Sequence, residues 1–270
     1  MDIIIIILVA FIAFLVLLWL GLKVKPRPFA PYPARTPDME MLQLPDDLHA
    51  PVERFYRLVY GNQIPIIKSA VISGRAKLRF FGLTFQGRFR FIHIAGKDYR
   101  HYIEATLFGF PLMKVNEYYL DGEGRLELPF GVIEDEHKIN QAANQGLWAE
   151  SFWLPSILIT DPRIRWKSVD DDSAILIVPF IEDTEQFVCR FDPQSGMPQF
   201  LETMRYRDAD DEQKILWINE VLVWREIDDM LSLAVGAVTW FDQGKPWAVF
   251  NAEEIVYNVD VSEAIRARGV

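Results

Sequence analysis

Twenty consecutive uncharged residues, from Ile3 to Leu22, constrain this chain more than any other feature of its sequence. A helix of this length, rising about 1.5 Å per residue, spans about 30 Å, the hydrocarbon thickness of a bilayer. A secretory signal peptide would have a basic start, a shorter apolar core and a small-residue cleavage site. The segment therefore predicts an uncleaved, single-pass transmembrane anchor over residues 1–22, with Trp19 at the membrane interface. A buried helix of a soluble protein is the alternative.

The basic residues around the span predict its orientation. Lys23, Lys25, Arg27 and Arg35 follow the span, and no positive residue precedes it. The positive-inside bias then places the rest of the chain in the cytoplasm, attached to the inner membrane. Because a long domain can override this bias, an outward-facing domain is the alternative.

Composition argues against a nucleic-acid partner and excludes stabilisation by an internal disulfide. The net charge is −10 and the basic residues are dispersed, which is not the charge pattern of a nucleic-acid-binding protein. The single cysteine, Cys189, cannot form an internal disulfide, so the fold must be stabilised by packing. Cys189 alternates with Phe187 and Phe191, which predicts a buried and unreactive thiol.

The sequence after the span divides into a stem and one large domain. Five prolines between residues 24 and 37 predict an extended, semi-rigid stem over residues 23–43, which would hold the domain away from the bilayer. Residues 44–270 are then expected to form a single β-rich domain. A short helix is expected at its start, over residues 44–60, where apolar residues recur on one side.

Alternating apolar and polar residues from Ser69 onward predict one strand after another. Residues 87–107 and 114–130 are typical of hairpins, with turns at Gly96-Lys97-Asp98 and at residues 121–124. Further strands are expected over Ala174–Pro179, Glu185–Phe191, Gln199–Tyr206, Ile215–Glu226, Val235–Phe241 and Ala248–Asn258.

One long interior helix interrupts these strands, beginning near Ile139 and ending before Pro155. The expected fold class is therefore mainly β (α+β), with a large curved antiparallel sheet, an incomplete barrel, around that helix. A β-sandwich is the alternative, but it would leave the helix without a place to pack.

Short motifs of common enzymes are absent from the sequence, including G-x-S-x-G, the Walker loop, H-E-x-x-H, C-x-x-C and G-x-G-x-x-G. His93 and His101 would oppose each other on the apolar face of the first hairpin if its turn has three residues. Two such imidazoles could bind a metal or act as acid and base. No third ligand is apparent, so we predict hydrogen-bonded core histidines, no metal site and no cofactor.

Glu150 is the other polar residue of interest, because Trp148 and Trp153 lie on either side of it in the sequence. A carboxylate among aromatic rings has a raised pKa unless it is paired. It could orient a ligand in a cavity, or it could be a structural carboxylate paired with Arg163 or Arg165, or face solvent. The candidate ligand-binding residues are His93, His101, Trp148, Glu150 and Trp153.

Three long segments, with shorter ones further along, resemble a bacterial family of unknown function whose members carry an N-terminal membrane segment. They read LPDDLHAPVERFYRLVYGNQIPIIKSAVISGR, HYIEATLFGFPLMKVNEYYLDGEGRLELPFG and NQGLWAESFWLP. The resemblance implies no particular activity. At the level of the fold alone, the expected architecture is also similar to LolA and its relatives, lipoprotein carriers in which an incomplete antiparallel barrel holds acyl chains.

These observations favour a membrane-anchored, non-enzymatic domain that binds a lipid or another apolar ligand at the bilayer. The second hypothesis is a structural or interaction subunit that docks a wide apolar sheet on a membrane protein partner. The third is an enzyme that uses Glu150 or the pair of histidines. A cavity of several hundred Å³ would favour the first hypothesis, and a packed interior with an exposed apolar patch would favour the second.

Overall fold

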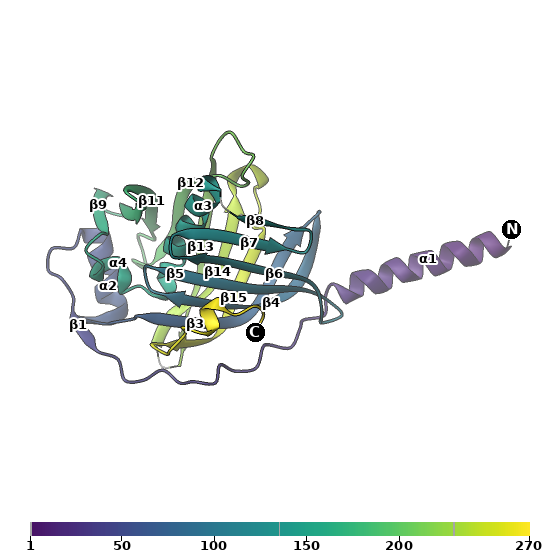
Figure 1. Cartoon of the computed structure of the whole chain (residues 1–270), viewed down its shortest axis with the longest axis horizontal. Helices are drawn as coiled ribbons and strands as arrows, with labels where there is room; N and C mark the ends of the chain where they lie inside the picture. The colour runs from purple at the N-terminus through teal and green to yellow at the C-terminus, as the bar shows by residue number, and fades with distance from the viewer. Residues whose placement is uncertain (1, 135, 229) are drawn as a thin grey trace.

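The computed structural model describes residues 2–134, 136–228 and 230–270, and one antiparallel sheet of 13 strands dominates these residues (Figure 1). The strands of the first half of the sheet are β3 (Ser69–Phe80), β4 (Leu83–Ile94), β5 (Asp98–Leu107), β6 (Phe110–Leu120), β7 (Glu123–Leu128) and β8 (Gly131–Glu134). Those of the second half are β9 (Arg165–Asp170), β10 (Ser173–Phe180), β11 (Asp183–Phe191), β12 (Pro198–Arg205), β13 (Ile215–Ile227), β14 (Met230–Trp240) and β15 (Ala248–Tyr257). A small separate sheet pairs β1 (Met41–Gln43) with β2 (Gln63–Pro65).

Two meanders build the large sheet. Strands β3 to β8 pair in chain order, strands β9 to β15 do the same, and β3 pairs with β15 to join the two halves. Short turns suffice inside each meander because neighbouring strands are antiparallel. The expected mainly β, antiparallel fold is confirmed. Within the described residues the sheet does not close into a barrel, because β8 and β9 are its two edges.

All the expected strands are present, but the sequence analysis missed β1 and β2 of the small sheet and two strands of the large sheet. The latter two are the edge strands, β8 (Gly131–Glu134) and β9 (Arg165–Asp170). Both are largely exposed, so neither carries the alternation of buried and exposed residues that identified the others.

The connection between β8 and β9 carries the interior helices. It consists of α3 (His137–Ala149), the 3₁₀ helix η1 (Glu150–Trp153) and the short helix α4 (Ile157–Thr160). Helix α3 contacts β6 and β7 of the first meander and β10 and β12 of the second. The α-helix ends at Ala149 rather than near Pro155 as expected, and the Ser151 hydroxyl donates to the Leu147 carbonyl where the helix tightens into η1.

Helix α2 (Ala50–Tyr60) packs beside η1. It begins six residues later than expected, with Pro51 in its first turn, a position that proline favours. The rings of Phe55 and Phe152 meet edge to face at 6.2 Å, and the Tyr56 hydroxyl donates to the Pro155 carbonyl at 2.6 Å. Aromatic packing and this one buried hydrogen bond therefore fix α2 against the chain that contains Glu150.

The proline-rich stem is extended, as the sequence analysis expected, and it lies along the outer face of the sheet. The Arg88 guanidinium donates to the Arg27 carbonyl at 3.1 Å and stacks on the Phe29 ring at 4.3 Å. The Tyr32 amide donates to the Glu254 carboxylate at 3.1 Å. An extended proline-rich backbone has no internal hydrogen bonds, so its carbonyls are free to accept from the arginines of the sheet.

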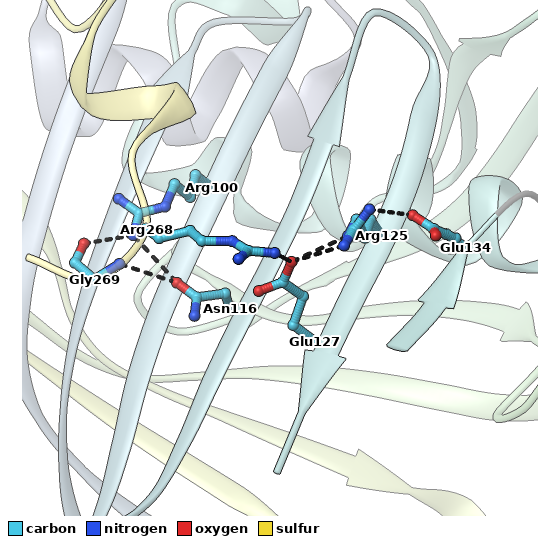
Figure 2. A network of polar contacts seen from close by, with 7 residues as sticks. All are labelled: Arg100, Asn116, Arg125, Glu127, Glu134, Arg268 and Gly269. Carbon is cyan, nitrogen blue, oxygen red and sulfur yellow. Dashed lines mark hydrogen bonds and ion pairs between the residues drawn. The ribbon is translucent and has the colours of Figure 1, made fainter. Parts of the chain in front are cut away.

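The C-terminal segment covers another part of the outer face. Figure 2 shows Arg268 bound to Glu127 of β7, and Gly269 bound to Arg100 and Asn116 of β5 and β6. Arg125 joins Glu127 from the other side. Both ends of the domain are thus tied to the outer face by charged and polar contacts.

Helix α1 (Asp2–Gly21) extends away from the domain, and no residue from Ile3 to Leu20 is buried (Figure 1). The span has a mean hydropathy of 3.5, and its length and composition are those of a membrane anchor or a signal sequence. The helix ends on the β5–β6 turn, where the Phe108 amide donates to the Gly21 carbonyl at 2.9 Å. A side chain at position 21 would meet the Phe108 ring, so Gly21 permits this close approach.

Candidate functional site

Polar side chains from three neighbouring strands meet under η1 on the inner face of the sheet. Strand β4 supplies His93, β5 supplies Tyr99 and His101, β6 supplies Glu117, and Glu150 begins η1. Only 1% of His93 and 4% of His101 is exposed to solvent. Buried polar groups must find partners within the protein, so their mutual contacts define the site.

The Glu150 carboxylate lies between the two imidazoles. One of its oxygens, Oε2, is 2.7 Å from His101 Nε2 and 3.1 Å from His93 Nε2. On the other side of the His101 ring, Nδ1 is 3.6 Å from Glu117 Oε2. The Tyr99 hydroxyl donates to the other oxygen of Glu117 at 2.6 Å.

The register of the hairpin differs from the expected one. The turn consists of Ala95, Gly96 and Lys97, so His93 pairs with Tyr99, and His101 pairs with Phe91. The two histidines are therefore diagonal neighbours on one face, with ring centres 5.8 Å apart, rather than direct partners. Gly96 provides the left-handed backbone conformation (φ +64°) that the middle of this turn requires.

Neither predicted arginine pairs with Glu150. Arg163 binds Asp161 instead, and Glu150 pairs with His101 and lies 3.1 Å from His93. The sequence analysis expected a raised pKa for Glu150 unless the carboxylate was paired. The histidines provide that pairing, so the pKa is not raised. Burial acts to raise the pKa of Glu150, but His101 and then His93 outweigh it and lower that pKa to about 2.

The two histidines carry different charges. Burial acts to lower the pKa of His101, but Glu150 and Glu117 on either side raise it to about 9. For His93, burial outweighs the attraction of Glu150 and lowers the pKa. At neutral pH, His101 is therefore a cation between two carboxylates, and His93 is neutral.

The two predicted tryptophans lie in different places. Trp153 lines the same cavity as His101 and Glu150, and its indole nitrogen donates to the Leu233 carbonyl at 2.8 Å. Trp148 is fully buried and lines another cavity, beside Gly96 and Arg163. Three of the other four candidate residues, His93, His101 and Trp153, therefore lie around Glu150, and Trp148 does not.

Two adjoining cavities lie against this cluster on the inner side of the sheet. The inner cavity has a volume of about 100 Å³ and is lined by His101, Glu117 and Glu150. The outer cavity has a volume of about 400 Å³ and a mostly apolar wall. Both are lined by Ile103, Glu117, Arg205 and Trp247, so these residues form the boundary between them.

Arg205 is a functional candidate that the sequence analysis missed. Its guanidinium stacks on the Trp217 ring at 4.2 Å, and its Nε atom has no hydrogen-bond partner among the described residues. No carboxylate in the described part of the chain lies within ion-pair distance of it, whereas Arg207 nearby binds Asp242. Burial lowers the pKa of Arg205, and Glu117 opposes that shift. The only signal in the sequence is an arginine at the end of a strand.

The fold and the site define a mainly antiparallel β protein with an apolar N-terminal helix and a buried histidine–carboxylate cluster beside an apolar cavity. The chain belongs to the DUF6544 family, a family of unknown function, whose model matches residues 38–252. The resemblance to a family of unknown function is thereby confirmed. None of the curated proteins matches this chain.

Solved structures of similar overall arrangement include members of the LolA superfamily, as the sequence analysis expected. A LolA superfamily protein from Nitrosomonas europaea has a TM-score of 0.48 at 10% identity, over 80% of this chain and 96% of that one. A DUF1329 family protein from Desulfovibrio piger has a TM-score of 0.43 at 13% identity, over 79% of this chain and 93% of that one. A putative outer membrane lipoprotein-sorting protein domain from Vibrio parahaemolyticus has a TM-score of 0.41 at 10% identity, over 79% and 92%.

The ion pair between His101 and Glu150 predicts a pH-dependent stability. The His101 pKa rises from an ordinary value of 6.5 to about 9 on folding, so its contribution is complete below pH 6.5 and is lost as the pH rises through 9. In metal-free protein, we expect the free energy of unfolding to fall over this range by about 3 kcal/mol at most. Urea unfolding of the full chain in detergent, followed by tryptophan fluorescence, measures it.

The matched control for this prediction is His101→Gln, which keeps a polar side chain but cannot titrate. The difference between the wild-type and variant stabilities should shrink as the pH rises from 6.5 to 9. A difference that stays constant over this range would contradict the assigned charge of His101.

Proposed function

We propose that this protein is a membrane-anchored, non-enzymatic domain that binds a single-chain anionic amphiphile at the bilayer. The observation that carries the proposal is the outer cavity of about 400 Å³, a volume within the range of roughly 300–1,000 Å³ typical of small-molecule sites. Its wall suits an acyl chain, being formed largely by Leu78, Phe80, Ile103, Ala105, Met113, Val115, Leu126 and Leu128.

The inner end of the cavity supplies the complementary charge. Arg205 lines both cavities and has no carboxylate partner among the residues described, so it is available to bind an anionic head group. A guanidinium binds carboxylate or phosphate through two parallel hydrogen bonds, and stacking on Trp217 fixes its plane. Glu150 is already paired with His101, so Arg205 replaces it as the proposed head-group residue.

The mouth of the cavity lies at the end of the sheet nearest to α1. Strands β3, β5 and β7 run in the same direction, so their following turns, at Phe81-Gly82, Phe108-Gly109 and Pro129-Phe130, lie at one end. Phe81 and Phe130 line the cavity and are 91% and 88% exposed, and Phe108 contacts the end of α1. An apolar span that ends beside exposed aromatic turns supports the proposal that this end of the domain faces the bilayer.

The chemistry of the turns supports a role for these rings outside the fold. A two-residue turn with positive φ at both positions normally begins with Asn, Asp or Gly. Asp121-Gly122, at the opposite end of the sheet, follows this rule (φ +52° and +91°). Phe81 and Phe108 occupy the same position with φ of +52° and +53°, where a bulky side chain is unfavourable. A locally unfavourable residue at an exposed tip is expected where function requires it.

Native mass spectrometry of the full chain, released from detergent after lipid extraction, tests the cavity. We expect one amphiphile to be retained per chain. Loss of one charge-assisted pair in Arg205→Met should weaken binding of added oleate by about 10–100-fold, because such a hydrogen bond contributes about 1.5–3 kcal/mol. Arg205→Met should not change the binding of oleyl alcohol, which has the same hydrocarbon tail as oleate but no charge.

The control variant is Arg190→Met, which removes a guanidinium that pairs with Glu202 elsewhere on the sheet. A wild-type chain that binds neither oleate nor the alcohol would overturn the cavity proposal and leave the hypothesis of an interaction subunit. Equal affinity for oleate and the alcohol would overturn only the assignment of Arg205.

The position of the mouth is tested by a fluorescent label in vesicles that carry lipid-attached quenchers. Cysteine in place of Phe81 or Phe130 should give a label that the quenchers reach, and Asp121→Cys, in the turn at the far end, should not. The native thiol will not interfere, because burial raises the pKa of Cys189 and keeps it unreactive. Equal quenching at positions 81 and 121 would contradict the proposed contact with the bilayer.

We further propose that α1 remains as the anchor and that the domain faces the cytoplasm. Lys23, Lys25 and Arg27 follow the span and support this orientation. In spheroplasts, added protease should leave the domain intact at full length, whereas in inverted membrane vesicles it should cleave the domain. Cleavage in intact spheroplasts would place the domain on the opposite side.

A further inference from the structure

We propose that His93, His101 and Glu150 form a binding site for one divalent transition-metal ion, with Zn²⁺ as the first candidate. This inference is independent of the amphiphile cavity, because it concerns other residues and another ligand. It also revises the expectation from sequence that the two histidines lack a third ligand.

The geometry carries the inference. One ligand atom from each residue, a ring nitrogen of each histidine and a carboxylate oxygen, all lie within 4.8 Å of one another. The carboxylate oxygen is 2.7 Å and 3.1 Å from the two nitrogens. In a tetrahedral zinc site with bonds of about 2.0 Å, neighbouring ligand atoms are about 3.3 Å apart. To make room for the ion, the carboxylate oxygen would move away from the His101 nitrogen by about 0.6 Å and from the His93 nitrogen by about 0.2 Å.

The state of His93 is a second, independent observation. Its side chain is almost fully buried, yet neither ring nitrogen has a hydrogen-bond partner among the described residues. The 3.1 Å approach of its Nε2 to Glu150 lacks the geometry of a hydrogen bond. Leaving a buried polar group without a partner costs roughly 1–3 kcal/mol. A metal ion bound at Nε2 would remove this cost at that atom.

Residues behind the three proposed ligands would orient them, as in other metal sites. Glu117 lies 3.6 Å from the far nitrogen of His101, and Tyr99 holds Glu117. A carboxylate behind a metal-binding imidazole orients the ring and strengthens its donor atom. His101 and Glu150 also line the inner cavity, so a fourth coordination position faces open space. Two imidazoles and one carboxylate suit Zn²⁺ or Fe²⁺ better than Ca²⁺ or Mg²⁺.

The test uses the full chain in detergent, without a polyhistidine tag and stripped of metal by a chelator. Titration with Co²⁺ should produce the intense visible bands of a four- or five-coordinate ion, saturate at one ion per chain and be reversed by Zn²⁺. Because Glu150→Gln and His93→Gln each remove a ligand, they should weaken Zn²⁺ binding by more than about tenfold, and Glu117→Gln by about tenfold.

The chain provides matched controls, since its two remaining histidines, His49 and His137, are both exposed. Glutamine at these two positions should leave the affinity unchanged. X-ray absorption of the wild-type protein loaded with Zn²⁺ avoids the risk that a variant fails to fold, and it should count two imidazole ligands. No saturable binding, fewer than two imidazoles, or binding lost in the His49 and His137 variants would overturn the site.

Discussion

The pairing of β3 with β15 is the interaction on which the rest of the structure depends. It joins residues as distant in sequence as Ala70 and Tyr257, and it turns two separate meanders into one sheet. Once joined, the two halves share α3 on the inner face. The terminal segments are also brought to the outer face, where Tyr32 meets Glu254 and Arg268 meets Glu127. Because this contact joins residues so far apart in sequence, it is expected to slow folding.

The sequence predicted most of the fold because most strands are buried on one face, and such burial leaves a period of two residues. It failed where that condition is absent, as in the exposed edge strands β8 and β9. The position of the stem was not predictable either. Proline content indicates an extended backbone, but only the three-dimensional arrangement puts Arg88 beside the Arg27 carbonyl.

The candidate site was predicted in part, for a similar reason. His93, His101 and Glu150 were each identified from their apolar surroundings, and the hairpin placed the two histidines on one face. Their meeting with Glu150 depends on how the β8–β9 connection crosses the sheet, a contact 49 residues apart in sequence between His101 and Glu150. Arg205 carried no local signal, because what distinguishes it is that no carboxylate of the described residues lies within ion-pair distance of it.

The hydrogen bond between Gly21 and Phe108 has a consequence for how the molecule could exchange a ligand. Because the stem is bound along the sheet, α1 and the domain cannot move apart. The proposed mouth of the cavity therefore stays at a fixed distance from the end of α1. A soluble carrier picks up its cargo in one place and releases it in another by diffusion. A domain held in this way would instead sample only what moves laterally within the plane of the membrane, and any onward transfer would require a second protein to come to it.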